Sequence, residues 1–381
     1  MLYGVTVGGG VNEVGTIFKF DATTATLTKL HDFTENTGHR PNASLVEASN
    51  GILYGTTTTG GNNNRGTIYS FDPGTNTYTD IFHFNGSRNR GGLENNPLKL
   101  LPNGFIYCFS AIGGAGNWGN IVKINPADNS VQVVQNLTEG TTNASAASLI
   151  GIGDKFYTIS YTAGSGFEGS LLEFDPVTDS LRVLFEFDEN EASNPTGRLV
   201  EVAPGVIQGT TQNSEIFTEA GTVFQYNLNT NEFNIVFEFN QAPLGRTPRR
   251  GLLAVSESAY YGFPQAGGST ENGVVYRYNP TTRQVTLVHE FDDKNGSFPH
   301  GALIMATNEL IYGTTRDGAS GNHGIIFSID PTTDVFTKVL EFDGISKGSR
   351  PRPLIQANNG KIYGTTAGGG TDNEGVLYEF D

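Results

Sequence analysis

Arginine is the residue type whose placement in this sequence most clearly predicts binding chemistry. Most of the arginines, Arg198 among them, precede or open the same recurring apolar segment, where His39 and His300 accompany them. A guanidinium group binds a carboxylate or sulfate through two parallel hydrogen bonds, so this clustering predicts a site for an anionic ligand. The predicted ligand-binding residues, which include the single tryptophan, are Arg40, Arg88, Arg90, Trp118, Arg246, Arg249, Arg250, His300, Arg350 and Arg352.

A structural role for the same arginines is the competing interpretation. Acidic residues occur in the same segments, among them Glu94, Glu191, Asp292 and Asp293, and ion pairs with them would occupy the guanidinium groups. An exposed ion pair stabilises a fold by only about 0–1 kcal/mol, so pairing alone does not explain why arginines gather at one point. The sequence leaves both interpretations open.

Trp118 lies in the glycine-rich stretch GGAGNWG, where other copies of the repeat have Asn, Glu, Arg or His. An exposed indole would stack on a sugar ring, with Phe167 and Phe217 as further aromatic side chains in comparable stretches. An indole wedged between two neighbouring sheets would instead belong to the core. The sequence leaves this choice open as well.

Catalytic and metal-binding patterns are scarce. The sequence contains no G-x-S-x-G, H-E-x-x-H or Walker motif, and its single cysteine is not part of a zinc-binding pattern. Four glutamates recur at one place in the repeat: Glu13, Glu168, Glu271 and Glu374. They belong to different copies, so we expect solvated charges and neither a metal ion nor another cofactor. A carboxylate pair such as Glu94 with Glu139 keeps glycosidic cleavage as an alternative.

These residues are positioned by a sequence that repeats about every 51 residues. Each full copy has four short apolar segments, here called A to D. Segment A carries a leucine in phrases such as ASLVEA, B reads IYGTT, C reads GTIFKFD, and D ends on a residue such as Phe33. Short β-branched and aromatic runs between Gly, Asn, Asp and Pro are typical of strands. Each copy therefore predicts a four-stranded antiparallel sheet.

Radial stacking of such sheets gives an all-β propeller, and we expect residues 1–381 to form one propeller domain. Short turns, such as residues 358–360 between A and B and 330–334 between C and D, should lie on one face. The longer B–C and D–A connections should lie on the other face, where we expect the ligand. Three histidines near the end of segment D are predicted to be structural: His31, His83 and His289.

The phrase LYGTT..GG....GTIF.FDP resembles the Gloeobacter/Verrucomicrobia-type repeat of bacterial multi-repeat proteins, and its strand order is similar to that of kelch blades. The resemblance covers essentially the whole chain. It implies a secreted or surface-associated propeller and no particular reaction. The third copy, with IYCFSAIGG, and the fifth, with QNSEIFTEAG, depart most from the pattern, so local differences are expected there.

The two ends of the chain complicate the blade count. The sequence opens with B, C and D and closes with A, B and C, so six complete copies lie between two partial ones. We expect eight blades with incomplete terminal blades; the alternative is a seven-bladed ring with residues 361–381 outside it. A neighbouring chain or further sequence would supply the missing strands by edge addition, which makes self-association a prediction.

Composition narrows the function classes. A formal net charge of −16 argues against binding to nucleic acids or anionic membranes, and no apolar run is long enough to insert into a bilayer. The opening MLYGVTVGGG lacks the pattern of a signal peptide, so an export signal is expected outside this chain. The leading prediction is a non-enzymatic extracellular or cell-surface propeller that binds a glycan or a protein. A lyase or hydrolase acting on acidic polysaccharide is one alternative, and a structural subunit of a fibre or surface assembly is the other.

Overall fold

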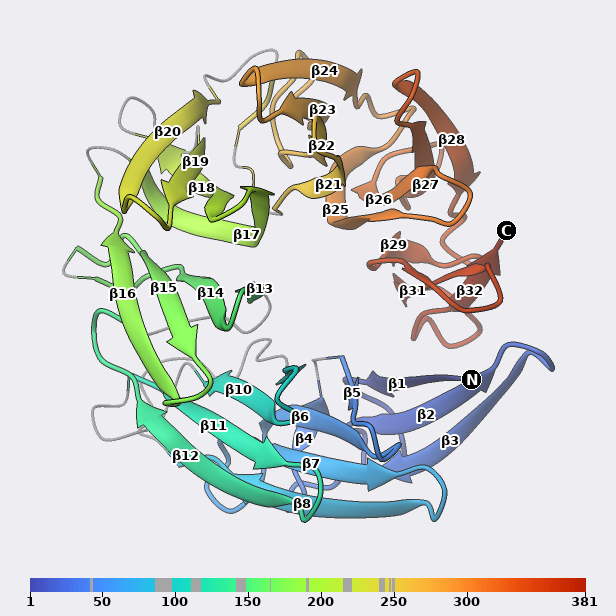
Figure 1. Cartoon of the computed structure of the whole chain (residues 1–381). Coiled ribbons are helices and arrows are strands. Elements are labelled where there is room, and N and C mark those ends of the chain that lie inside the picture. Colours follow the sequence, from blue (N-terminus) through green and yellow to red (C-terminus); the bar gives the residue numbers. More distant parts are fainter. Residues whose placement is uncertain are drawn as a thin grey trace. The chain divides into compact units, whose positions relative to one another are not determined.

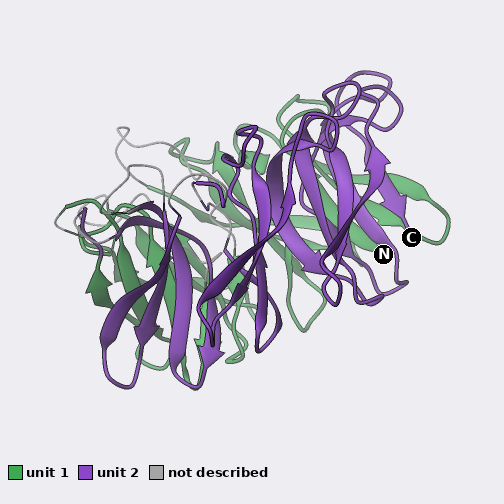
Figure 2. Cartoon of the chain, turned by 90° about the horizontal axis from the view of Figure 1, so that it is seen from above, with its two compact units in different colours: residues 1–186 green, residues 187–381 purple. Residues whose placement is uncertain are grey.

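The computed structural model describes the chain except for residues 42–43, 86–97, 111–117, 142–148, 165, 190–191, 215–220, 240–243, 247 and 249–250. The described residues form strands, turns and bends and contain no helix, so no membrane-crossing helix occurs among them. Contacts divide the chain into unit 1, Met1–Glu186, and unit 2, Phe187–Asp381 (Figure 2). Each unit is a succession of antiparallel sheets, here called blades and numbered in chain order (Figure 1).

Unit 1 holds blades 1 to 4. Blade 1 contains β1 (Leu2–Thr6), β2 (Thr16–Asp21) and β3 (Thr26–Asp32). Blade 2 contains β4 (His39–Pro41), β5 (Val46–Glu47), β6 (Leu53–Thr59), β7 (Thr67–Asp72) and β8 (Thr77–His83). Blade 3 contains β9 (Leu98–Leu100), β10 (Ile106–Ser110), β11 (Asn120–Asn125) and β12 (Ser130–Asn136). Blade 4 contains β13 (Ile150–Ile152), β14 (Lys155–Ser160), β15 (Ser170–Asp175) and β16 (Ser180–Glu186).

Unit 2 holds blades 5 to 8. Blade 5 contains β17 (Ala192–Ala203), β18 (Val206–Ser214), β19 (Thr222–Asn227) and β20 (Glu232–Glu238). Blade 6 contains β21 (Leu253–Ser256), β22 (Ala259–Gly262), β23 (Val274–Asn279) and β24 (Gln284–Glu290). Blade 7 contains β25 (Ser297–Met305), β26 (Ile311–Asp317), β27 (Ile325–Asp330) and β28 (Val335–Glu341). Blade 8 contains β29 (Ser349–Pro351), β30 (Ile355–Gln356), β31 (Ile362–Gly368) and β32 (Leu377–Phe380).

The strand order confirms the predicted all-β propeller with incomplete blades at both ends. In the described residues, blade 1 has only the B, C and D strands, and blade 8 has A, as β29 and β30, followed by B and C. Strand A begins earlier than the apolar pattern predicted, because β17 and β25 already include the Ser-x-Pro residues upstream of the leucine. How the two units are placed to close a ring stays a prediction.

The glycine of the IYGTT phrase is explained by packing within a blade. A methyl group on Gly55 of β6 would lie 3.0 Å from Leu45 Cδ2 and would collide with the Tyr69 ring of β7. At Gly313 of β26, the corresponding distance to Leu303 Cδ2 is 2.8 Å. Only glycine therefore leaves room for both the leucine of strand A and the aromatic ring of strand C.

The tyrosine of the same phrase joins neighbouring blades. The Tyr54 hydroxyl donates a hydrogen bond of 2.6 Å to Asn129 Oδ1 in the next blade, and the Tyr261 hydroxyl donates one of 2.6 Å to Asp334 Oδ1. Asn129 and Asp334 occupy the C–D turns with φ of 57° and 58°, a region that Asn and Asp tolerate. Arg277 Nη1 adds an ion pair of 3.0 Å to Asp334 Oδ2.

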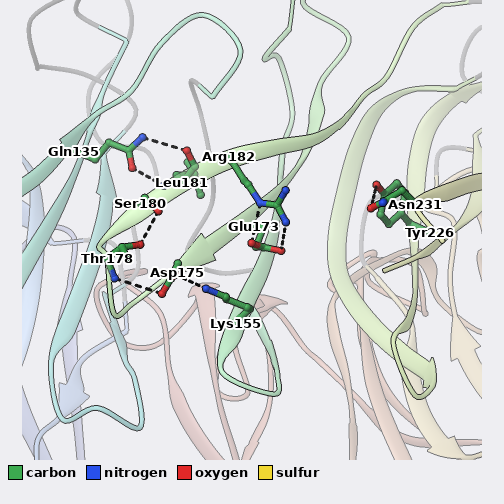
Figure 3. Close-up of polar contacts among 10 residues, drawn as sticks. All are labelled: Gln135, Lys155, Glu173, Asp175, Thr178, Ser180, Leu181, Arg182, Tyr226 and Asn231. Carbon is green, nitrogen blue, oxygen red and sulfur yellow. Dashed lines mark hydrogen bonds and ion pairs between the residues drawn. The ribbon is translucent and has the colours of Figure 1, made fainter. Parts of the chain in front are cut away.

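Outer strands of neighbouring blades also contact each other (Figure 3). Gln135 of β12 accepts the N–H of Leu181 at 2.6 Å and donates its amide to the Leu181 carbonyl at 3.3 Å. Within blade 4, Arg182 binds Glu173 through two bonds of 2.9 Å. The amide pair fixes β12 against β16, while the exposed ion pair only links two strands of one sheet.

Two of the predicted structural histidines occupy the position equivalent to Gln135. The His31 ring stacks on Tyr78 of the next blade at a centroid distance of 4.1 Å, and the His289 ring stacks on Phe336 at 3.5 Å. Burial lowers the pKa of both imidazoles, to about 4 for His289, since the charged form is disfavoured away from water. The prediction that these histidines are structural is confirmed.

Candidate functional site

The start of strand A has an unusual backbone that recurs from blade to blade. The residue before proline has a positive φ at Arg40 (57°), Asn194 (56°), Phe298 (53°) and Arg350 (55°). Left-handed backbone is uncommon for residues other than glycine and is found more often at functional sites than elsewhere. In blades 2, 5, 7 and 8 the repeat therefore presents one side chain in a conformation that the surrounding structure must impose.

A hydrogen bond to the preceding blade imposes this conformation. The N–H of Arg40 donates to the Val14 carbonyl at 2.9 Å, and the N–H of Arg350 donates to the His323 carbonyl at 2.9 Å. Phe298 forms the same bond of 2.9 Å with the carbonyl of Asn272. The residue that precedes the glycine of strand C thus anchors the next blade.

The proline that follows packs on that glycine. A methyl group on Gly273 would lie 2.7 Å from Pro299 Cδ, and one on Gly324 would lie 2.9 Å from Pro351 Cδ. Both glycines also have positive φ, 91° and 90°. The GTIF glycine is therefore required twice, for its own backbone and for the proline of the following blade.

The connection that leads to Arg350 is held by an aspartate. The Asp343 carboxylate accepts hydrogen bonds from the Ser346 hydroxyl and from the N–H groups of Lys347 (2.8 Å) and Ile345 (2.9 Å). These bonds stabilise the charged form and lower the pKa of Asp343 to about 2. The loop before β29 is thereby fixed by its own turn, which limits the freedom of the Arg350 backbone.

Phe298 of β25 and Arg316 of β26 lie between the same two cross-strand pairs. The register pairs Ser297 with Asp317 and Pro299 with Thr315, which places Phe298 and Arg316 between them. The Phe298 residue is 43% exposed and the Arg316 side chain 53% exposed. An exposed aromatic ring and an exposed guanidinium group therefore come from the same stretch of two paired strands.

Asp317 links this surface to blade 8. Arg316 Nε lies 3.4 Å from Asp317 Oδ2, and Arg350 Nε lies 3.9 Å from Asp317 Oδ1. The Asp317 side chain is only 16% exposed, whereas that of Arg350 is 61% exposed. Two positive charges therefore share one carboxylate and leave guanidinium N–H groups available for a further anion. We call Phe298, Arg316, Asp317 and Arg350 the double-arginine site.

The other predicted residues that the structure describes have different surroundings. Arg246 Nη2 pairs with Glu271 Oε2 at 3.1 Å, so the ion-pair interpretation holds for this arginine, with a glutamate that the sequence had indicated to be solvated. Arg40 and Arg352 are exposed, and neither side chain has an ion-pair partner in the described part of the chain. His300 is half-buried, and its carbonyl accepts the Thr314 hydroxyl at 2.9 Å.

Four predicted binding residues lie outside the described residues: Arg88, Arg90, Arg249 and Arg250. Arg40 belongs to unit 1, and Arg246, His300, Arg350 and Arg352 belong to unit 2. Of the predicted arginines that the structure describes, only Arg350 shares a carboxylate with a second arginine. A common rim for all the arginines stays a prediction.

Trp118 has the surroundings expected of a wedge between blades. Its side chain is half-buried and packs against a core cluster that includes Phe109 and Ile121 of blade 3 and Leu172 and Phe174 of blade 4. This placement supports the core interpretation of the indole. Exposed aromatic side chains of unit 1 lie instead in the next B–C connection, where Tyr161 and Phe167 are each 41% exposed.

Phe298 and Arg316 were not singled out from the sequence. The signal was available in the repeat register, because Phe298 immediately precedes the proline of strand A exactly as Arg40 and Arg350 do. Arg316 stands four residues after the tyrosine of strand B, a position that Thr58 and Tyr161 occupy in other blades. Among the described residues, no group of three or more His, Cys, Asp or Glu side chains has a metal-binding arrangement.

The repeat of this chain matches that of a known protein family. The sequence model of the Gloeobacter/Verrucomicrobia repeat matches residues 1–101, 88–262 and 219–381. No curated protein sequence matches the chain.

Solved structures with a similar fold have very different sequences. The extracellular domain of a hybrid two component system from B. thetaiotaomicron superposes with a TM-score of 0.56 at 12% identity, over 90% of this chain and 38% of that one. A second such domain from the same organism gives 0.56 at 15% identity, over 89% and 41%. Oligogalacturonate lyase from Vibrio parahaemolyticus gives 0.53 at 12% identity, over 100% and 97%. This chain thus spans about two fifths of the length of the extracellular domains, and likeness at such identities shows the fold alone.

Proposed function

The chain belongs to the Gloeobacter/Verrucomicrobia repeat family, and from this premise we propose that it is a non-enzymatic extracellular propeller that binds an acidic glycan at the double-arginine site. The observation that carries the proposal is that Arg316 and Arg350 share the Asp317 carboxylate, with an exposed Phe298 ring on β25, the strand that pairs with β26. An aromatic face stacks on the C–H groups of a sugar ring, while guanidinium groups bind its carboxylate or sulfate.

The backbone supports a binding role because it already holds Phe298 and Arg350 in place before a ligand binds. Phe298 and Arg350 are held by hydrogen bonds and proline contacts that do not involve their side chains. A ligand therefore meets a preorganised surface and loses less free energy to ordering than a mobile loop would require. The extracellular location is supported by the similarity in fold to the two extracellular domains from B. thetaiotaomicron.

Calorimetric titration with oligogalacturonates and with neutral galactan oligosaccharides tests the proposal. We expect the acidic ligand alone to bind, more weakly as salt is added, and Arg350→Gln or Arg316→Gln to weaken binding about 10-fold, the value of a hydrogen bond to a charged group. Phe298→Gly removes the ring at a left-handed position that glycine adopts freely, so it should weaken binding while the fold is retained.

The matched control is Arg182→Gln, which changes an exposed arginine of unit 1 that is 67% exposed and paired with Glu173. Equal binding by this variant and by Arg350→Gln would contradict the double-arginine site. Binding of neutral and acidic oligosaccharides alike would contradict the acidic ligand. An unsaturated product released from oligogalacturonate would show an enzyme, the alternative function, instead of a binding module.

A further inference from the structure

Strand β1 is a copy of strand B with one side uncovered. In blade 1, Leu2 pairs with Phe20 and Gly4 with Phe18. In blade 2, Leu53 pairs with Phe71 and Gly55 with Tyr69, so β1 and β6 have the same register. β1 is nevertheless an edge strand of its sheet, whereas β4 and β5 cover β6.

Burial confirms that the edge of β1 is open in the described structure. All of the first five residues of β6 are buried, and so are those of β26, but none of the five residues of β1 is buried. Thr57 and Thr315 are 0% exposed, while the equivalent Thr6 is exposed. The apolar and threonine side chains of β1 therefore lack the cover that the same side chains have elsewhere.

The cover used in other blades has a defined sequence and register. Strand A places a proline opposite the last threonine, as in Pro41 with Thr57, and the residue after its leucine opposite the tyrosine, as in Val46 with Tyr54. The leucine lies four residues after the proline and packs on the glycine of strand B in blades 2, 5, 6 and 7. The distances from added Cβ atoms to leucine Cδ2 are 3.0, 2.9, 3.1 and 2.8 Å.

We propose that the edge of β1 binds an extended strand of the A type with the pattern Pro-x-x-x-Leu followed by an apolar residue. The proline would lie opposite Thr6, the residue after the leucine opposite Tyr3, and the leucine over Gly4. Backbone hydrogen bonds supply the affinity of such strand addition, and the leucine and proline supply the selectivity. This interaction is separate from the double-arginine site and does not depend on glycan binding.

A peptide of residues 295–306, NGSFPHGALIMA, provides the test because it is the A-type strand of blade 7. Hydrogen exchange of the full chain is measured with and without the peptide. We expect the amides of β1 to exchange at least about 10-fold more slowly with the peptide present, since edge amides become hydrogen-bonded, and those of β26 to be unchanged. The control peptide carries Leu303→Asp and should give no protection.

A second measurement avoids weak intermolecular binding. Residues 295–306 are fused through a flexible Gly/Ser linker ahead of β1, which raises the effective concentration, and thermal unfolding is compared with that of the Leu303→Asp fusion. A higher Tm for the unaltered fusion alone supports the proposal. Equal effects of both sequences in both assays would overturn it. So would β1 amides that are as protected as those of β6 in the chain without peptide.

Discussion

At the residue scale, side chains at equivalent positions of the repeat differ in role: some make structural contacts and others are exposed. Asn194 shares with Arg350 the left-handed position before proline, yet Asn194 accepts a hydrogen bond of 2.8 Å from Asn213, while Arg350 is 61% exposed. Trp118 shows the reverse, since a residue type that often binds sugars packs here against the core. Residue type alone therefore did not decide which side chain is available to a ligand.

Replacement of Trp118 by alanine should test that assignment. We expect the free energy of unfolding to fall by about 1–3 kcal/mol, because a half-buried ring leaves a cavity between blades 3 and 4, and acidic glycan binding to persist. Chemical denaturation and calorimetric titration measure the two quantities. Unchanged stability together with lost binding would contradict the core role of the indole.

Stability should depend on His289 between pH 6.5 and pH 4. The unfolded imidazole takes up a proton below about 6.5, whereas burial lowers the folded pKa to about 4, so folding is opposed as the pH falls through this interval. The stabilisation is complete above pH 6.5 and is lost towards pH 4. The half-exposed site reduces the effect to about 1–2 kcal/mol.

His289→Gln provides the comparison, because Gln135 occupies the equivalent position in blade 3. Denaturation at several pH values should show a shallower loss of stability for the variant between pH 6.5 and pH 4. Parallel pH profiles for the two proteins would show that His289 does not titrate in this way.

At the element scale, repeated short phrases are explained by contacts between blades. The GTIF glycine receives the proline of the next blade, and the IYGTT tyrosine reaches the C–D turn of the next blade. Blade 5 departs from the pattern: Gln208 replaces the tyrosine and bonds Gln225 at 3.0 Å and Tyr278 at 3.3 Å. Blade 5 thus has a different set of contacts at its junction with blade 6, whereas most of the departing stretch QNSEIFTEAG lies outside the described residues.

The contributions of Tyr261 and Asp334 to the free energy of unfolding should be coupled. In a double-mutant cycle of Tyr261→Phe and Asp334→Gly, we expect a coupling energy of about 1 kcal/mol, because a buried hydroxyl donates to a charged acceptor. Denaturant unfolding of the four proteins gives the value. Tyr312→Phe is the matched control, since its hydroxyl accepts from Asn308 of the same blade, at 2.9 Å. If the two substitutions change the free energy of unfolding in a strictly additive way, the contact between Tyr261 and Asp334 does not stabilise the junction of blades 6 and 7.

The C–D turns should make the fold sensitive to acid below pH 4. Asp175 is paired with Lys155 (Figure 3). It also accepts the N–H of Val177 at 2.9 Å, and these contacts lower its pKa to about 2. A depressed carboxylate pKa stabilises the fold above the unfolded value of about 4, and this is lost as the pH falls towards 2. Asp175→Asn should be less stable at neutral pH and should lose less on acidification. Identical acid profiles would contradict this role of Asp175.

At the scale of the whole molecule, contacts mainly join neighbouring blades, and unit 1 and unit 2 each have core clusters of their own. Stability of a repeat fold is therefore a sum of blade and interface contributions, and its loss can be local. The formal net charge of −16 favours solubility. In this acidic protein the double-arginine site is a local excess of positive charge. Added salt should therefore weaken ligand binding without unfolding the protein.

Ile329→Ala should show how far destabilisation spreads. Ile329 is 0% exposed in the core between blades 6 and 7, so its truncation should cost about 2–5 kcal/mol. Hydrogen exchange should accelerate in blades 6 to 8 and remain unchanged in blade 3 of unit 1. Equal acceleration in both units would show that the chain unfolds as one cooperative body.

The sequence by itself determined the strands, their order and the partial terminal blades, because a period of about 51 residues and the phrases IYGTT and GTIF specify local backbone and packing. It also placed Arg350 among the binding candidates. Only the tertiary structure decided that Arg350 meets Arg316 at Asp317, that Arg246 is neutralised by Glu271, and that Trp118 is packed. The reason is physical: strand pattern depends on neighbours along the chain, whereas exposure and ion pairing depend on side chains that the register brings together from different strands and blades.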